Sequence, residues 1–392
     1  MGRIKADRGL QKLILIFMGV LAAVSLIQGC KNAVLVSQDF QWDAAKALTL
    51  KVDPYDESLQ PSGLLDSDFE KYYLQMEANQ FPSLLLLLFP YTLLPPLTAR
   101  YAWLLSNLFF TAGMIVLLRK TFLQRADSFT FAFFMLLMIA GTPYRNQIGV
   151  GQHTLFAFFF FLLAVYCIDK QEGFSLGAAL ALFVCYFKYT LTVPLAIYFI
   201  YRKRYKEIAV SAGLHVILTG ICAWWLGDSF FNMLIKPLKV SSKLAGEGGL
   251  DFGVLLHGSP IAYVLALIVL ILLTVEAVRA GRFLVFGRAQ SCGDVDAVLI
   301  SILTLWSLII TYHRTYDFFV IVTVLAFMLI PACPGYLKIM YAVTLIGVFF
   351  VLRIFSEAAP SKLVVGSIYY VFTILVTVAG LKCILAKDKG DL

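Results

Sequence analysis

The chain has 392 residues, of which 60% are hydrophobic and only 14% are charged, whereas soluble domains carry about 25% charged residues. Apolar runs of about 20 residues, the length that crosses a bilayer, recur along the sequence. The net charge of +8 does not indicate nucleic acid, because the Lys and Arg residues lie mainly between apolar runs, where they orient helices. The sequence therefore predicts an all-α, polytopic membrane protein with one integral membrane domain over residues 1–392.

Charge predicts the orientation of the first apolar helix, Leu13–Gly29. Its N-terminal flank contains Arg3, Lys5, Arg8 and Lys12. A basic flank stays in the cytoplasm, so residues 31–100 form the first extracytoplasmic loop, with short interfacial helices. That loop begins with SQDFQWDAAKALTLKVDPYD (Ser37–Asp56), which holds four aspartates in a chain that otherwise avoids charge.

The apolar run Phe81–Leu97 decides the rest of the topology. It contains Pro82, Pro90, Pro95 and Pro96. If this run crosses the membrane, the basic cluster 119–125 falls outside and every later cluster inverts; if it lies at the interface, the clusters fall inside. We interpret it as a non-spanning segment, which must be buried in protein or line a cavity.

Twelve membrane-spanning helices are then expected, with both termini in the cytoplasm. Their approximate ranges are 13–30, 101–118, 128–141, 154–169, 173–187, 190–201, 207–227, 259–279, 296–311, 317–331, 337–354 and 363–382. The seven cysteines form no CxxC pair and do not stand at metal-ligand spacing with the four histidines. We therefore expect no metal site and no cofactor.

The predicted outer segments carry both acids and cations. Besides the aspartates of the first loop, they contain Arg145, His153, Lys188, His313 and Arg314. A carboxylate can remove a proton from an acceptor, and cations can hold a departing phosphate. This combination is what transfer from a lipid-linked phosphate requires.

Five stretches resemble glycosyltransferase family 87. They are DFQWDAAKAL…DPY (Asp39–Tyr55), FPSLLLLLFPYTLLPPLTARYAWLLSN (Phe81–Asn107), GQHT (Gly151–Thr154), FKYTLTVPL (Phe187–Leu195) and YHRTYDFF (Tyr312–Phe319). The sequence departs from the family pattern at His153 and Thr154, where an aliphatic residue and Asn are usual. It also reads QFPS where the family has a Tyr-Pro-Pro run.

The resemblance implies a GT-C-like bundle that transfers a hexose, mannose most often, from a polyprenyl-phosphate donor. The acceptor would be lipid- or glycan-linked, on the extracytoplasmic face of the inner (plasma) membrane. Asp39 matches the first-loop Asp that is the family's catalytic base, with direct, inverting displacement and no metal. The donor's phosphate and sugar would contact Arg145, Gln152, His153, Lys188, His313 and Arg314.

Structural alternatives remain for these residues. Asp39 precedes a helical pattern and could be an N-cap. Asp43, one turn on, could be the base instead, or a solvated helix residue. Lys188 could simply extend from a helix end to the interface, and the two histidines could be interfacial hydrogen-bonding groups. The later loop acids fit a solvated face; they are Asp53, Asp56, Glu57, Asp66, Asp68 and Glu70.

Two other functions also fit a polytopic chain. A lipid or glycan transporter or flippase would show internal repeats and ionisable residues near the bilayer midplane, but the ionisable residues here gather at the predicted outer edge. A lipid-linked glycan ligase would use similar cations with a different arrangement around the nucleophile. Sugar transfer with release of polyprenyl phosphate distinguishes the transferase from the transporter.

Overall fold

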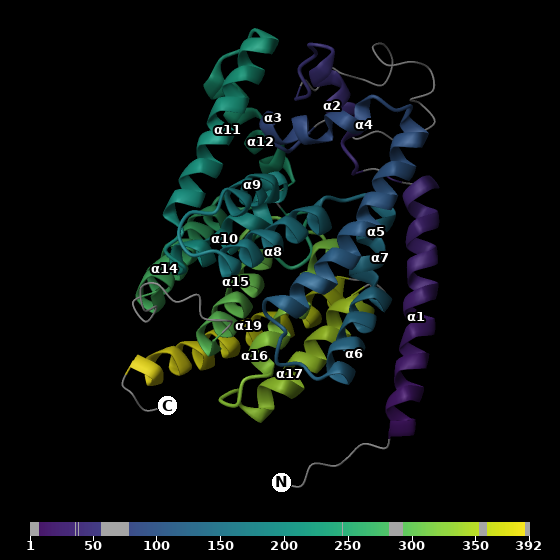
Figure 1. The fold of residues 1–392 in the computed structure, drawn as a ribbon, viewed down its shortest axis with the longest axis vertical. Helices are drawn as coiled ribbons and strands as arrows, with labels where there is room; N and C mark the ends of the chain where they lie inside the picture. The colour runs from purple at the N-terminus through teal and green to yellow at the C-terminus, as the bar shows by residue number, and fades with distance from the viewer. Residues whose placement is uncertain are drawn as a thin grey trace.

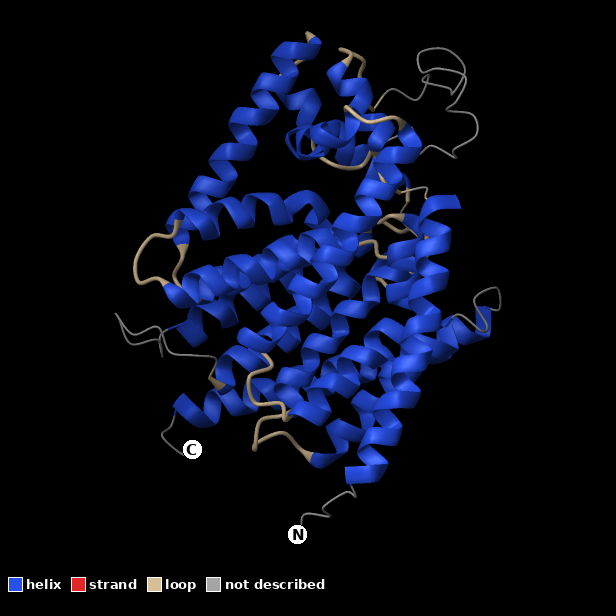
Figure 2. Cartoon of the chain, turned by 45° about the vertical axis from the view of Figure 1, so that its right-hand side comes forward, coloured by secondary structure: helices blue, strands red, loops and turns tan. Residues whose placement is uncertain are grey.

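The computed structural model describes residues 8–35, 37, 39–55, 78–244, 246–281, 293–352 and 359–388. Every regular element in these ranges is a helix, which confirms the all-α prediction (Figure 2). Several charges considered above lie outside the described residues, namely Arg3, Lys5, Asp56, Glu57, Asp66, Asp68 and Glu70.

Four helices run between two ends of the molecule. They are α5 (Pro96–Lys120), α8 (Thr154–Lys170), α10 (Tyr189–Tyr201) and α15 (Asp294–Ile310). At one end Arg202 pairs with Asp169 at 2.8 Å and with Asp296 at 3.8 Å, which joins α8, α10 and α15. The ring of Phe122, just after α5, lies 5.5 Å from that of Tyr198. We call this the basic end; it carries Arg119, Lys120, Arg125, Arg202 and Arg204.

The opposite tips of the same helices meet at a second end, which we call the site end. Lys188, before α10, pairs with Asp317 at 3.7 Å, and Thr154 at the start of α8 donates to the same carboxylate. Arg100 in α5 donates to the carbonyl of Ser37 at 2.9 Å. The 17 residues of α8 separate the two ends by about 25 Å, close to the thickness of a bilayer core.

Short helices between α1 (Arg8–Leu35) and α5 cover the site end. They are α2 (Trp42–Thr49), α3 (Pro82–Leu85), η2 (Leu86–Leu88) and α4 (Phe89–Thr92), near the top of Figure 1. The indole of Trp42 donates to the carbonyl of Tyr91 at 2.8 Å and fastens α2 to α4. Residues 82–92 form a shorter apolar helix, which at 1.5 Å per residue cannot cross a core of about 30 Å.

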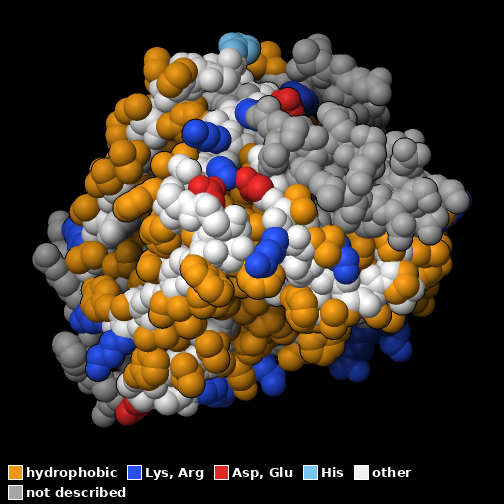
Figure 3. All heavy atoms as spheres, turned by 90° about the horizontal axis from the view of Figure 1, so that it is seen from above, with side chains coloured by type: hydrophobic (Ala, Val, Ile, Leu, Met, Phe, Trp, Pro, Cys, Tyr) orange, Lys and Arg blue, Asp and Glu red, His pale blue; other side chains and the backbone are white. Residues whose placement is uncertain are grey.

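The remaining helices complete the bundle. They are α6 (Ser128–Ala140), α7 (Thr142–Val150), α9 (Leu176–Cys185), η3 (Tyr186–Lys188), α11 (Tyr205–Leu226), α12 (Phe230–Lys243), α13 (Phe252–Leu255), α14 (Ile261–Ala280), η5 (Thr315–Val324), α16 (Leu325–Met328), α17 (Gly335–Ile346), η6 (Gly347–Val351) and α19 (Ala359–Asp388). In α12, Lys236 pairs with Asp53 and Asp228 and so ties the first loop to this helix. Figure 3 shows the molecule from above relative to Figure 1. Blue and red side chains gather near the middle of that view, with hydrophobic side chains beside and below them.

The described helices support a multi-pass membrane protein but do not confirm the count of twelve spans. Six are long and apolar enough to cross a membrane, or up to seven if the bent pair α7–α8 is one span. Over its described residues each of the twelve predicted segments is mostly helical, yet several are short: α6 has 13 residues and α15 has 17. Composition correctly predicted the helices, but several of them are too short in the fold to count as candidate spans.

One of the six candidates, Leu176–Tyr201, contains a reversal of direction. The backbone N–H of Ser175, before α9, donates to Glu207, and Arg204, after α10, donates to the carbonyl of Ile168. Both outer ends of this stretch therefore lie at the basic end. Lys188, between the two helices, lies at the site end. A straight helix of this length cannot return to its own start, so α9 and α10 run in opposite directions.

The topology prediction concerns the side of the membrane on which the basic end lies. A reporter fused after Lys206 is expected to read cytoplasmic, because clustered Lys and Arg residues stay inside. Alkaline phosphatase and green fluorescent protein fusions at this position would measure it. A periplasmic signal would place the basic end outside, and the site end would then face the cytoplasm.

Candidate active site

Asp39 lies on a tight turn that three other segments hold in place. Its backbone N–H donates to the carbonyl of Val150 at 2.9 Å. The next residue, Phe40, stacks on Trp103 with ring centroids 5.1 Å apart, and Nε2 of His153 lies 3.0 Å from the Phe40 carbonyl. Gln41 then adopts a positive φ of 61°, a strained conformation that persists only where surrounding contacts hold it.

The turn also decides between two interpretations of Asp39. Helix α2 begins at Trp42, its N-cap is Gln41, and no side-chain cap is present at this described helix end. The N-cap interpretation of Asp39 is therefore wrong. The half-buried Asp39 side chain instead accepts from Gln152, in the turn between α7 and α8, and hydrogen-bonds to Tyr316 of η5.

The Gly151–Thr154 turn faces Asp39 from the junction of α7 and α8, where the chain bends by 106°. Gly151 has a φ of +71°, and a Cβ there would lie only 2.4 Å from Oγ of Ser37. The indole of Trp103 donates to the Gly151 carbonyl at 2.8 Å. Glycine is therefore required here so that the GQHT turn and the Asp39 turn can touch.

Gln152 connects this turn to the Asp39 carboxylate. Its Nε2 donates to Oδ2 of Asp39 at 3.3 Å and to the hydroxyl of Tyr316 at 2.8 Å. Its Oε1 accepts the backbone N–H of His153 at 2.7 Å, which fixes the orientation of the amide. The Tyr316 hydroxyl also hydrogen-bonds to Asp39, so two side chains orient the carboxylate.

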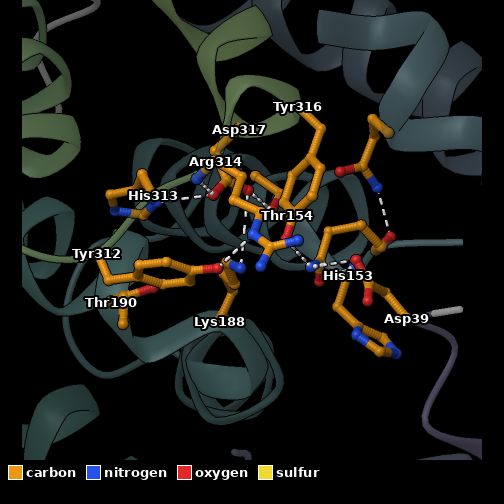
Figure 4. A network of polar contacts seen from close by, with 12 residues as sticks. Asp39, His153, Thr154, Lys188, Thr190, Tyr312, His313, Arg314, Tyr316 and Asp317 are labelled. Carbon is orange, nitrogen blue, oxygen red and sulfur yellow. Dashed lines mark hydrogen bonds and ion pairs between the residues drawn. The ribbon is translucent and has the colours of Figure 1, made fainter. Parts of the chain in front are cut away.

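A cationic group lies beside Asp39, on the 312–317 segment and on the turn between α9 and α10 (Figure 4). Lys188 pairs with the fully buried Asp317, and its ammonium lies 5.6 Å from the ring of Tyr316. His313 Nδ1 lies 2.9 Å from the other Asp317 oxygen. Arg314 contacts the hydroxyl of Tyr312 and reaches Glu247 at 3.4 Å. About half of the Arg314 side chain is exposed, so it remains accessible to a ligand.

The pKa of Asp39 depends on the nearby charges of Lys188 and Arg314. Burial raises the pKa of Asp39 above its ordinary value, and the nearby charges of Lys188 and Arg314 act in the opposite direction. Asp317 adds to the rise by like-charge repulsion. A carboxylate with a raised pKa is a stronger base than an ordinary one, which suits proton abstraction.

Asp43, the alternative base, lies in a different environment. Its side chain is 2% exposed, and its Oδ2 has no hydrogen-bond partner among the described residues. Burial raises its pKa to about 7, and among the described side chains the charge of Arg100 acts in the opposite direction. Asp43 is therefore buried in α2, and neither Lys188 nor Arg314 is among the charges that act on its pKa.

The structure does not bring Arg145 to the cationic group. Its guanidinium donates to Oε1 of Gln28 in α1 at 2.9 Å and to the hydroxyl of Thr142 at 3.3 Å. The ring of His153 is engaged elsewhere, with Nε2 at 3.0 Å from the Phe40 carbonyl and the ring stacked on Phe187 at 4.4 Å, but it lies near enough to Lys188 for that charge to act on it. Lys188, His313 and Arg314 do come together, with Gln152 between them and Asp39.

Arg314 and Arg145 form a matched pair for mutation. Arg314→Ala is expected to slow transfer by about 10²-fold, the effect of losing a positioned charge on a leaving group. Arg145→Ala should have the smaller effect, because its contacts are with α1. Initial rates with a saturating and a limiting donor concentration measure both variants. Equal losses in the two variants would show that Arg145 also contributes to transfer. Normal rates in Arg314→Ala would contradict a role for Arg314 in binding the donor's phosphate.

Sequence reasoning missed three contributors, namely Thr154, Tyr316 and Asp317. All three lie inside the GQHT and YHRTYDFF stretches, but their roles depend on pairing across more than 100 residues. The one local signal was the spacing of His313 and Asp317, four residues apart. The described residues contain no group of three or more His, Cys, Asp or Glu side chains that could hold a metal ion.

Comparisons with known proteins agree with the motifs. The model of "Glycosyltransferase family 87" matches residues 82–311, which include Gln152, His153 and Lys188. The Asp39–Tyr55 and Tyr312–Phe319 stretches lie outside the matched range. No curated protein and no solved structure matches the chain significantly. Because the family model covers more than half of the chain, this protein belongs to glycosyltransferase family 87.

Proposed function

We propose that this membrane glycosyltransferase moves a hexose, mannose in the first instance, from a polyprenyl-phosphate donor to a lipid- or glycan-linked acceptor. The observation that carries the proposal is the chain of contacts from the half-buried Asp39 carboxylate through Gln152 to Tyr316, whose ring lies 5.6 Å from the ammonium of Lys188. A base beside a phosphate-binding group is the minimum that such a transfer needs.

The proposed reaction is a single displacement. Asp39 takes the proton of the acceptor hydroxyl while that oxygen attacks C1 of the hexose. The bond between C1 and the phosphate oxygen breaks, and its electron pair stays on the polyprenyl phosphate. Attack opposite the leaving group inverts the configuration at C1. The departing group is a stable anion, so Lys188, His313 and Arg314 suffice to stabilise it.

The proposed location follows from the two ends of the bundle. Asp39 lies at the site end, about 25 Å along α8 from the basic end. If the basic end faces the cytoplasm, transfer takes place at the extracytoplasmic face of the plasma membrane. Both described termini fit this arrangement, because α1 begins with basic residues and the end of α19 lies near Asp294.

The test uses the purified full-length protein in lipid nanodiscs with synthetic polyprenyl-phosphate mannose. The expected result is a mannosylated acceptor and one equivalent of polyprenyl phosphate, with the anomeric configuration inverted. Nucleotide-activated mannose serves as the control and should give no product. Transfer from the nucleotide donor alone, or translocation of the lipid without cleavage, would contradict the proposal.

A further inference from the structure

A large pocket opens beside the candidate active site. Its volume is about 860 Å³, within the range of ligand sites in proteins. It lies between the segment that enters α14 and the first turns of α19, and it is lined by Gly246, Gly249, Leu250, Val254, Leu255, His257, Lys362, Leu363, Gly366, Ser367 and Tyr370. None of these residues has a part in the chemistry described above.

The pocket is apolar within and polar at its rim. The hydroxyl of Tyr370 donates to the carbonyl of Leu250 at 2.8 Å, and that of Ser367 donates to the carbonyl of Leu363 at 2.8 Å, so backbone groups already occupy both. Lys362 and His257 are exposed at its edge. A ligand inside the pocket therefore meets hydrocarbon, while its outer portion meets cationic or hydrogen-bonding groups.

The depth of the pocket matches one membrane leaflet. Both α14 and α19 contain candidate spans that begin at the pocket, at Ile261 and Lys362. The lining residues of α19 extend from Lys362 to Tyr370, about 12 Å along a helix. Half of a bilayer core is about 15 Å thick. The pocket wall along α19 is therefore nearly as long as one leaflet is thick.

One layer of backbone separates the pocket from the cationic group. Gly249, in the pocket wall, donates its N–H to the carbonyl of His313 at 2.6 Å, and Asp251 accepts the N–H of His313 at 3.3 Å. Glu247, two residues before Gly249, faces Arg314 at 3.4 Å. A Cβ on Gly248 would lie 1.7 Å from Oδ2 of Asp251, so glycine keeps this wall thin.

We propose that this pocket binds the polyprenyl chain of the donor, with the donor's phosphate lying across the glycine-rich 246–249 wall against Arg314. The inference rests on the proposed function. The positions of the basic side chains and of Asp39 favour the donor over the acceptor as the occupant of the pocket. The wall touches His313 and Arg314, whereas Asp39, the proposed base for the acceptor, lies at the opposite side of the network (Figure 4).

A photo-crosslinking experiment tests the occupant directly. The probe is a polyprenyl phosphate with a diazirine in its chain, added to the full-length protein in phosphatidylcholine nanodiscs. Labelled peptides should come from residues 246–257 and 362–370, and excess unlabelled polyprenyl phosphate should remove the label. Labelling spread over all lipid-facing helices, or resistant to competition, would overturn the inference.

Two matched variants test the pocket itself. Ser367→Trp places a large ring in the pocket, while Val364→Trp places one on the same helix at a position that faces outward and is 59% exposed. Ser367→Trp should reduce competed labelling, and raise KM for a long-chain donor, by about tenfold. Its KM for a donor with two isoprene units should stay near wild type, as should both values in Val364→Trp. Leu255→Trp repeats the test from the opposite wall.

The same preparation separates this inference from the proposed function. Competed labelling of the pocket without transfer from any polyprenyl-phosphate hexose would refute the proposed function and leave the lipid site in place. Transfer with labelling elsewhere would refute the pocket and leave the function in place. Unchanged labelling in both Ser367→Trp and Leu255→Trp would also refute the pocket.

Discussion

Asp39→Asn is expected to fold like the wild type and to lose about 10²–10⁴-fold of its transfer rate, the usual contribution of a positioned base. The amide keeps an oxygen that can accept from Gln152 and Tyr316, so the turn should stay in place. It cannot take a proton at neutral pH. Initial rates with polyprenyl-phosphate mannose, together with the thermal unfolding temperature of each variant, measure both effects.

Two control variants accompany Asp39→Asn. Asp43→Asn should transfer at a rate near that of the wild type, because Asp43 is buried in α2 and neither Lys188 nor Arg314 is among the charges that act on it. Asp39→Ala should also fold, since the N-cap of α2 is Gln41 and no cap is lost. An active Asp39→Asn enzyme with an inactive Asp43→Asn enzyme would transfer the catalytic role to Asp43.

Lys188→Met is expected to reduce transfer by about 10²-fold or more, because it removes a buried positive charge beside the departing phosphate. The same change breaks the pair with Asp317, which is fully buried. Breaking a buried pair typically costs about 3–5 kcal/mol of stability. The single variant therefore combines a loss of chemistry with a loss of folding, and its rate must be normalised to folded protein.

The double variant Lys188→Met/Asp317→Asn separates the two contributions. It restores charge balance, so its thermal unfolding temperature should recover toward that of the wild type. If Lys188 binds the donor's phosphate, transfer by the folded double variant stays about 10²-fold down. Recovery of both stability and transfer would show that Lys188 serves the fold alone.

The local sequence predicted the helices better than it predicted which of them cross a membrane. All twelve predicted segments are mostly helical over their described residues, because apolar composition and period are local properties. Length decides a span, and α6, η5–α16 and α17–η6 are short. Helix α15 has only 17 residues, and almost all of them are buried in the bundle. Burial in protein and burial in lipid select the same residue types, so composition does not distinguish them.

The candidate site was predicted in part for a similar reason. The first-loop aspartate and the GQHT, FKYT and YHRTYD stretches each carry a local pattern, and the structure brings these stretches together. The roles of Asp317 and Tyr316 follow from contacts with Thr154, Lys188 and Gln152. No local pattern encodes such pairings. Arg145 fitted the same charge argument, but in the fold its side chain turns to α1.

The dependence of kcat/KM on pH tests the central role of Asp39 most directly. The base must be ionised, so kcat/KM should fall as the pH falls through the Asp39 pKa, which burial raises above its ordinary value. This acidic limb should persist in Asp43→Asn, although the pKa of Asp43 is raised to about 7, and should vanish from the residual activity of Asp39→Asn. An acidic limb that is unchanged in Asp39→Asn, or lost in Asp43→Asn, would contradict the assignment of Asp39 as the base.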